Sequence, residues 1–129
     1  MRAIILDDDP LILSVLTRTL HRLGHDVASY TDPTLCPIYT SKCCPCQNPI
    51  FCPHFIISDF DMPHINGILF LEELHKKGCR CRHFAIMSGS SIPKIILERI
   101  AGLNVKFFAK PFETAQITSW LRQIEPYAP

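Results

Sequence analysis

The sequence lacks an excess of charge of either sign. Among its 129 residues, 13 Lys and Arg stand against 12 Asp and Glu, so the formal net charge is +1. A surface that binds nucleic acid or anionic lipid needs a basic excess. We therefore expect no direct contact with nucleic acid and no attachment to a membrane surface.

Long apolar runs are also missing. The longest extend over a few residues, such as Ala3–Leu6, whereas a helix that spans a membrane needs about 20 apolar residues. The N-terminus meets three aspartates immediately after this run, and it lacks the small-residue cleavage site of a signal peptide. These absences lead us to expect a cytoplasmic protein.

Internal repeats, low-complexity tracts and linkers are absent as well. Hydrophobic residues make up 47% of the sequence and charged residues 19%, which is an ordinary globular composition that excludes wholesale disorder. At roughly 150 residues per domain, residues 1–129 are predicted to form a single domain.

Cysteine and proline, in contrast, are abundant, with seven and eleven residues. Five of the cysteines lie between Cys36 and Cys52. Thiols stay reduced in the cytosol, so this density favours metal or redox chemistry over a disulfide framework. Five prolines, from Pro33 to Pro53, make a helix improbable over residues Thr31–Pro53. We expect this Cys/Pro-rich segment to be irregular.

Elsewhere, short apolar runs alternate with helical patterns. The predicted strands are Ala3–Leu6, His25–Tyr30, Phe55–Ser58, Phe84–Met87 and Val105–Ala109. The predicted helices are Leu11–Leu23, the stretch from Asn66-Gly67 to Gly78, the stretch from Ile92 to near Gly102, and Ile117–Ile124. This alternation predicts an α/β fold with a parallel sheet covered by helices on both faces.

Polar side chains follow four of these strands. Asp7 and Asp8 come after the first strand, Asp59 after the third, Ser88 after the fourth and Lys110 after the fifth. The carboxyl ends of parallel strands share one edge of a sheet, so these side chains are predicted to converge. Any single acid or hydroxyl could instead cap the next helix, but capping is a much weaker explanation for all of them together.

The predicted cluster contains three carboxylates, which would repel one another. A divalent cation removes this repulsion. Oxygen ligands with positions left open for water suit Mg²⁺, so the sequence predicts a magnesium site at this edge.

Four motifs, in this order and each at the end of a predicted strand, resemble the receiver domain of two-component response regulators. They are Ile4–Pro10, Ser58–Pro63 with Asn66-Gly67, Ile86–Gly89 and Phe108–Phe112. The resemblance covers nearly the whole chain and is poorest from about Thr31 to Pro53. It implies a flavodoxin-like five-stranded parallel sheet in the order 2-1-3-4-5, in which the Cys/Pro-rich segment replaces the second helix.

The resemblance also implies a role for each residue of the acidic pocket. Asp59 matches the aspartate that accepts a phosphoryl group from a sensor histidine kinase. Asp7 and Asp8 match the acidic pair that holds Mg²⁺, together with Asp59 and the backbone carbonyl of Asp61. At most, such a domain catalyses its own phosphorylation and dephosphorylation.

The remaining motif residues match the switch. Ser88 matches the hydroxyl that bonds the phosphoryl group, and Lys110 matches the lysine that pairs with it. Phe107 stands where the family often has a tyrosine, so a rotamer switch would lack a hydroxyl. The resemblance implies a downstream protein target or output domain, and it leaves a homodimer open.

A second metal site is predicted at the opposite edge of the sheet. In the implied fold the third and fourth strands are neighbours, so ligand residues before them would lie close together. Thiolates and imidazoles suit Zn²⁺, and an iron–sulfur cluster uses the same chemistry. Unligated thiols and disulfides are the alternatives. The ligand candidates are Cys43, Cys46, Cys52, His54, Cys79 and Cys81, with Cys44 as a substitute.

Two other functions compete with the receiver interpretation. The first is a metal- or redox-sensing pseudo-receiver, which the intact set of acidic, hydroxyl and lysine residues opposes. The second is a phosphatase of the haloacid-dehalogenase type, whose Asp-x-Asp motif could be Asp59-Phe60-Asp61 or Asp7-Asp8-Asp9. The short chain and Pro10, in place of a hydroxyl residue, oppose the phosphatase.

Overall fold

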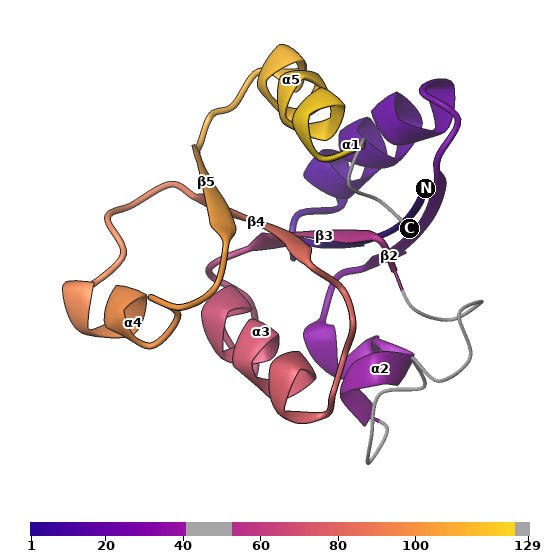
Figure 1. Cartoon of the computed structure of the whole chain (residues 1–129). Helices are drawn as coiled ribbons and strands as arrows, with labels where there is room; N and C mark the ends of the chain where they lie inside the picture. The colour runs from indigo at the N-terminus through magenta and orange to yellow at the C-terminus, as the bar shows by residue number, and fades with distance from the viewer. Residues whose placement is uncertain (41–52, 126–129) are drawn as a thin grey trace.

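A computed structural model of the protein describes residues 1–40 and 53–125. Strands and helices alternate along these residues (Figure 1). The strands are β1 (Arg2–Leu6), β2 (Asp26–Tyr30), β3 (Phe55–Asp59), β4 (His83–Ser88) and β5 (Val105–Ala109). The helices are α1 (Pro10–Arg22), α2 (Pro37–Thr40), α3 (Gly67–Lys76), α4 (Lys94–Glu98) and α5 (Thr114–Ile124), with a 3₁₀ turn at Pro33–Leu35.

The five strands form one parallel sheet in the order β2-β1-β3-β4-β5, as the resemblance implied. Register aligns the carboxyl ends of neighbouring strands. Leu6 pairs with Ser58, Asp59 with Met87, and Ser88 with Ala109. The residues that follow these positions therefore emerge at one edge of the sheet.

Helices cover both faces of the sheet, as predicted (Figure 1). On one face α1 and α5 pack side chains such as Leu16 and Ile117 against Ile5 of β1. On the other face, α2 and α3 pack against β1, β3 and β4 through side chains that include Ile38 and Leu71. All five residues of β3 are buried, because this central strand has a hydrophobic layer on each side.

Helices α1 and α3 each begin at a residue whose side chain caps the helix, and each is followed by a glycine. The Asp9 side chain accepts a hydrogen bond from the backbone N–H of Leu11, and Asn66 does the same for Leu69. Both helices are followed by a glycine with a positive φ, Gly24 at 88° and Gly78 at 80°, the conformation that ends helices most readily.

The prediction that residues Thr31–Pro53 contain no helix is wrong for their first part. Pro33 and Pro37 each occupy the first position of a short helix, where the missing N–H has no partner to lose. The single turn of α2 buries Ile38, and the ring of Tyr39 stacks on Phe70 of α3 at 5.9 Å. These prolines therefore start helical turns instead of preventing them.

Lys77, the residue directly after α3, also secures α2. The Lys77 ammonium donates to the backbone carbonyl of Tyr39 and lies 4.9 Å from the centre of its ring. A cation at the carboxyl end of a helix satisfies carbonyls that the helix leaves open. The one-turn α2 is therefore held by contacts to α3 as well as by its own hydrogen bonds.

Helix α4 is shorter than predicted, since it spans Lys94–Glu98 instead of Ile92 to near Gly102. Pro93 precedes it without a side-chain cap. Beyond Glu98 the backbone N–H groups of Arg99 and Ile100 bond three residues back instead of four, which marks turns in place of a continuing α-helix. Among residues 1–40 and 53–125, no helix combines the length and apolarity needed to cross a membrane.

Candidate functional site: an acidic pocket at the carboxyl ends of the strands

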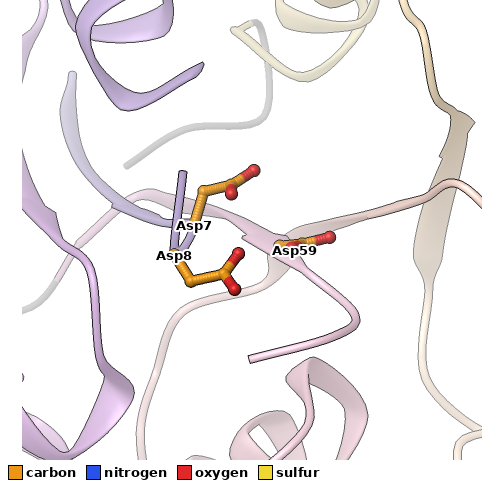
Figure 2. A group of neighbouring side chains, drawn as sticks. All are labelled: Asp7, Asp8 and Asp59. Carbon is orange, nitrogen blue, oxygen red and sulfur yellow. The ribbon is translucent and has the colours of Figure 1, made fainter. Parts of the chain in front are cut away.

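Three carboxylates gather where β1 and β3 end, as the sequence predicts. Figure 2 shows the side chains of Asp7, Asp8 and Asp59 directed to the same side. One oxygen from each lies within 4.8 Å of the other two. Asp7 has no exposed surface and Asp59 is 5% exposed, whereas Asp8 is exposed. Burial of two carboxylates at this spacing requires positive charge close by.

Lys110 supplies that charge. Its Nζ atom lies 2.9 Å from Oδ2 of Asp7 and 3.1 Å from Oδ1 of Asp59. A backbone hydrogen bond places it there, because the Lys110 N–H donates to the carbonyl of Ser88 at 2.8 Å. The peptide bond from Lys110 to Pro111 is cis. The prediction that the lysine after the last strand converges with the aspartates is therefore confirmed.

The charges in the pocket shift two pKa values. Burial and the nearby charge of Asp7 raise the pKa of Asp59 to about 6, although contact with Lys110 opposes the rise. Burial would lower the pKa of Lys110, but hydrogen bonds to Asp7 and Asp59 and their charges raise it above its ordinary value. Lys110 therefore stays protonated, and Asp59 is mostly ionised at neutral pH.

Asp9 differs from the two aspartates that precede it. Its side chain caps α1, and its backbone N–H donates to Oδ1 of Asp7 at 2.9 Å. Capping, the alternative explanation for an acid after a strand, is thus correct for Asp9. Asp9 supports the cluster by orienting the carboxylate of Asp7.

A glycine positions Asp59 from the other side. A Cβ atom on Gly67 would lie 2.4 Å from the backbone carbonyl oxygen of Asp59, and the Gly67 N–H donates to the carbonyl of Phe60 at 2.9 Å. The start of α3 therefore rests directly on the end of β3. The Asn66-Gly67 pair predicted the start of a helix, but this contact was missed because it depends on how α3 packs against the sheet.

Ser88 reaches the same edge, and its hydroxyl forms hydrogen bonds within its own loop. Its Oγ donates to the carbonyl of Ser90 at 2.6 Å, and the N–H of Ser90 donates back at 3.2 Å. The side chains of Asp61, in the loop after β3, and of Phe107, which is 42% exposed on β5, contact none of the three carboxylates in any described hydrogen bond or ion pair. The roles predicted for these residues stay predictions.

The donor set suits the metal that the family implies. Three carboxylates and one ammonium group leave two negative charges when all are ionised, and every donor is a hard oxygen. Mg²⁺ prefers such ligands and keeps waters in its remaining positions. Asp7, Asp8 and Asp59 would hold the ion.

The opposite edge of the sheet is different. Nδ1 of His54 accepts a hydrogen bond from the backbone N–H of Arg2 at 2.9 Å, and Cys81 is buried against the core. Within the described ranges, the three aspartates are the only group of three or more His, Cys, Asp and Glu residues placed to hold a metal ion. His54, Cys79 and Cys81 therefore form no three-ligand group among themselves. Cys43, Cys44, Cys46 and Cys52 lie outside the described residues, so the second metal site stays a prediction.

Comparison with known proteins identifies the class. Residues 3–122 match the family of response regulator receiver domains, and the chain belongs to this family. The resemblance noted in the sequence is thus confirmed. The C4-dicarboxylate transport transcriptional regulatory protein DctD of Pseudomonas aeruginosa is 25% identical over 122 residues, which are 95% of this chain and 24% of that protein. The chain therefore spans about a quarter of that relative.

Solved structures share the fold. The chemotaxis protein CheY4 of Vibrio cholerae superposes with a TM-score of 0.74 at 19% identity, over 95% of this chain and 97% of that chain. The receiver domain of an HD domain-containing protein from Pseudomonas fluorescens gives 0.75 at 19% identity, over 98% and 94%. At this identity the likeness concerns the fold alone.

Proposed function

We propose that this chain accepts a phosphoryl group on Asp59 from a histidine kinase in a Mg²⁺-dependent reaction, and that phosphorylation changes its conformation to control a partner or an output domain. The observation that carries this proposal is the buried Asp59 carboxylate, which lies against the Lys110 ammonium within a cluster of three aspartates.

The chemistry follows from these residues. An ionised oxygen of Asp59 forms the new P–O bond as the P–N bond of a phosphohistidine breaks, and the leaving imidazole takes a proton from solvent. The Lys110 ammonium, already 3.1 Å from Oδ1 of Asp59, neutralises part of the incoming charge. Mg²⁺ held by Asp7, Asp8, Asp59 and the Asp61 carbonyl would supply further neutralisation when bound.

The switch would begin at Ser88. To bond a phosphoryl group on Asp59, the Ser88 hydroxyl must leave the carbonyl of Ser90. This exchange of hydrogen bonds would move the loop that connects β4 to α4. Helix α4 contains no fully buried side chain, and only Ile96 and Leu97 pack, partly buried, against the core, so its packing resists displacement less than that of α3. Phe107 of β5, which is partly exposed, would change its surroundings when this region moves.

A partner that donates the phosphoryl group must contact the surface around Asp59. Leu11 and Val15 of α1 are strongly exposed. They line an apolar pocket of about 470 Å³ together with Pro111, Phe112 and Lys110. An exposed apolar surface beside a reactive group favours docking of another protein.

Incubation with acetyl phosphate and Mg²⁺, followed by intact-mass measurement, tests the proposal. We expect the mass of one added phosphoryl group. This mass should not appear when Mg²⁺ is chelated before the acetyl phosphate is added, and it should be absent in Asp59→Asn. Asp9→Asn is the matched control, because asparagine still caps α1 and keeps the backbone N–H that donates to Asp7. It should be phosphorylated like the native chain.

Two other outcomes would favour the competing functions. Rapid turnover of phosphomonoesters would indicate a phosphatase of the haloacid-dehalogenase type. A chain that binds Mg²⁺ but never gains the phosphoryl mass would indicate a pseudo-receiver. Either result would contradict the proposal.

A further inference from the structure

We propose that Asp32 and His64 form a positioning pair that holds the loop between β3 and α3, and with it Asp61, beside the acidic pocket. The inference rests on the proposed function, because it assigns this pair a part in Mg²⁺ binding. Nδ1 of His64 lies 2.8 Å from Oδ2 of Asp32.

The topology places this contact across the end of β1. Asp32 follows β2 and His64 follows β3, and β1 lies between these two strands in the sheet. The loop after β1 carries Asp7 and Asp8, and the Asp7 N–H donates to the carbonyl of Tyr30 at the end of β2. The pair therefore joins the two loops on either side of the loop that carries Asp7 and Asp8.

Asp32 is a fixed anchor. Its Oδ1 accepts hydrogen bonds from the backbone N–H of Thr34 at 2.9 Å and from the Thr34 hydroxyl at 2.8 Å, which leaves Oδ2 for His64. The N–H of Thr34, above all, holds the pKa of Asp32 below its ordinary value. The carboxylate thus keeps its charge and its direction without His64.

The backbone of His64 adopts a conformation that a side-chain contact must help to stabilise. Its φ is 72°, in the left-handed region that residues other than glycine seldom adopt, so the contact to Asp32 helps to hold a conformation that the backbone alone would leave. The Asp61 carbonyl, the proposed backbone ligand, is three residues earlier in the same loop. A restraint on His64 therefore limits where that carbonyl can point.

Exposure argues against a mainly stabilising role. The His64 side chain is 64% exposed and that of Asp32 is 18% exposed, and exposed polar pairs of this kind contribute little to folding. Residues that orient a metal ligand typically change metal affinity by about 10- to 100-fold when they are replaced. Loss of the pair should thus appear in Mg²⁺ affinity more than in thermal stability.

The test compares His64→Ala, Asp32→Asn and the double variant with the native chain. Asparagine at position 32 can still cap the 3₁₀ turn, so this variant removes the charge and keeps the fold. Mg²⁺ affinity is measured by calorimetric titration, and phosphorylation by acetyl phosphate is followed as a function of Mg²⁺ concentration. Lys76→Ala is the control, since it breaks the exposed pair with Glu73 on α3.

We expect each single variant to weaken Mg²⁺ binding about 10-fold, the lower end for residues that orient a metal ligand. The double variant should be no weaker, because both changes remove one contact. Phosphorylation should need correspondingly more Mg²⁺, yet reach nearly the native rate at saturation. His64→Gly accepts the positive φ without the side-chain contact to Asp32, so weakened binding in this variant as well would assign the effect to the contact.

Unchanged Mg²⁺ dependence in both single variants, with native phosphorylation on Asp59, would overturn the role of the pair and leave the proposed function standing. Full native affinity in His64→Gly would overturn it too, because the backbone conformation alone would then suffice. A native chain that takes no phosphoryl group on Asp59 would overturn the proposed function and this inference together.

Discussion

Both edges of the sheet carry residues of the types that bind metal ions, but the two edges arrange these residues differently. At the carboxyl edge, Asp7, Asp8 and Asp59 come within 4.8 Å of one another. At the opposite edge, His54, Cys79 and Cys81 lie before β3 and β4 but form no such group among the described residues. The second metal site there depends on residues outside the described ranges.

The difference shows that a shared edge is not sufficient for a site. Asp7 and Asp59 continue paired strands whose register leaves their side chains little choice of direction. Cys81, in contrast, faces the core, and the ring of His54 bonds the backbone of Arg2. Convergence therefore requires both a common edge and a common direction.

The largest expected effect comes from a change that disturbs only the carboxyl edge. Gly67→Ala should destabilise the fold by about 3 kcal/mol, because the new Cβ would lie 2.4 Å from the Asp59 carbonyl oxygen and must push α3 from β3. It should also slow phosphorylation of Asp59. Urea denaturation measures the first effect and intact mass the second.

Gly102→Ala is the matched control, because a Cβ at position 102 would meet nothing within 4 Å. Its stability should remain within about 0.5 kcal/mol of the native value. Equal stability of both variants would mean that α3 and β3 can separate freely, against the close contact at Gly67.

Sequence reasoning succeeded wherever a buried strand determines a side chain. The apolar runs indicated the strands that end at Asp59 or directly before Asp7 and Lys110, and the order of the motifs indicated which strands are neighbours. Residues that directly follow parallel strands come together because the carboxyl ends of these strands lie at the same edge of the sheet. The meeting of Asp7, Asp8, Asp59 and Lys110 could therefore be predicted, whereas the direction of the Ser88 hydroxyl could not.

It failed where the outcome depends on packing between elements. Nothing in the local pattern shows that Lys77 and Phe70 hold a one-turn α2, or that α4 ends at Glu98. The contact between Asp32 and His64 joins two loops that lie far apart in sequence. Such pairs follow from tertiary structure, which a single sequence does not reveal.

The second expected effect belongs to the opposite edge. The purified, reduced protein should contain about one Zn²⁺ or one iron–sulfur cluster per chain. Its removal should cost about 2 kcal/mol, well below the values of isolated zinc fingers because this domain has its own core. Elemental analysis and thermal denaturation check both points.

Mg²⁺ binding at Asp7, Asp8 and Asp59 should survive that removal, since the two sites would occupy opposite ends of the strands. Metal-free protein with full stability and seven titratable thiols would contradict the prediction. Loss of Mg²⁺ binding along with the second metal would show that the two edges are coupled.

A smaller effect is expected from Asp59→Asn in buffer without Mg²⁺. The folded chain raises the pKa of Asp59 from 3.8 to about 6, so it binds this proton more tightly than the unfolded chain does. Native stability therefore falls, relative to the variant, as the pH rises from about 4 to 6, and the difference stays constant above that range. At pH 8 the variant should be about 1 kcal/mol more stable, because Lys110 and solvent screen the repulsion.

Denaturation curves between pH 4 and 8 measure this difference. Added Mg²⁺ should reverse the order, since the ion binds the native cluster and stabilises its folded form. A variant that is less stable at pH 8, or one whose stability runs parallel to the native curve at every pH, would contradict the charge repulsion.

The smallest expected effect concerns α4, which links the carboxyl edge to the proposed output. Nε of Arg99 lies 2.7 Å from Oε1 of Glu72, and Nη2 lies 3.0 Å from Oε2. This two-point contact holds the end of α4 to α3, while α4 itself buries no side chain. Arg99→Gln should therefore loosen α4 by about 0.5 kcal/mol, the usual contribution of an exposed pair.

Amide hydrogen exchange in residues 94–100 should rise about twofold, whereas Lys76→Ala, which breaks a pair confined to α3, should leave that exchange unchanged. Since Asp59 and Lys110 do not touch this contact, phosphorylation of Arg99→Gln should proceed at the native rate. Equal exchange in the two variants would show that packing of Ile96, Leu97 and Ile100 against the core, and not the ion pair, holds α4 in place.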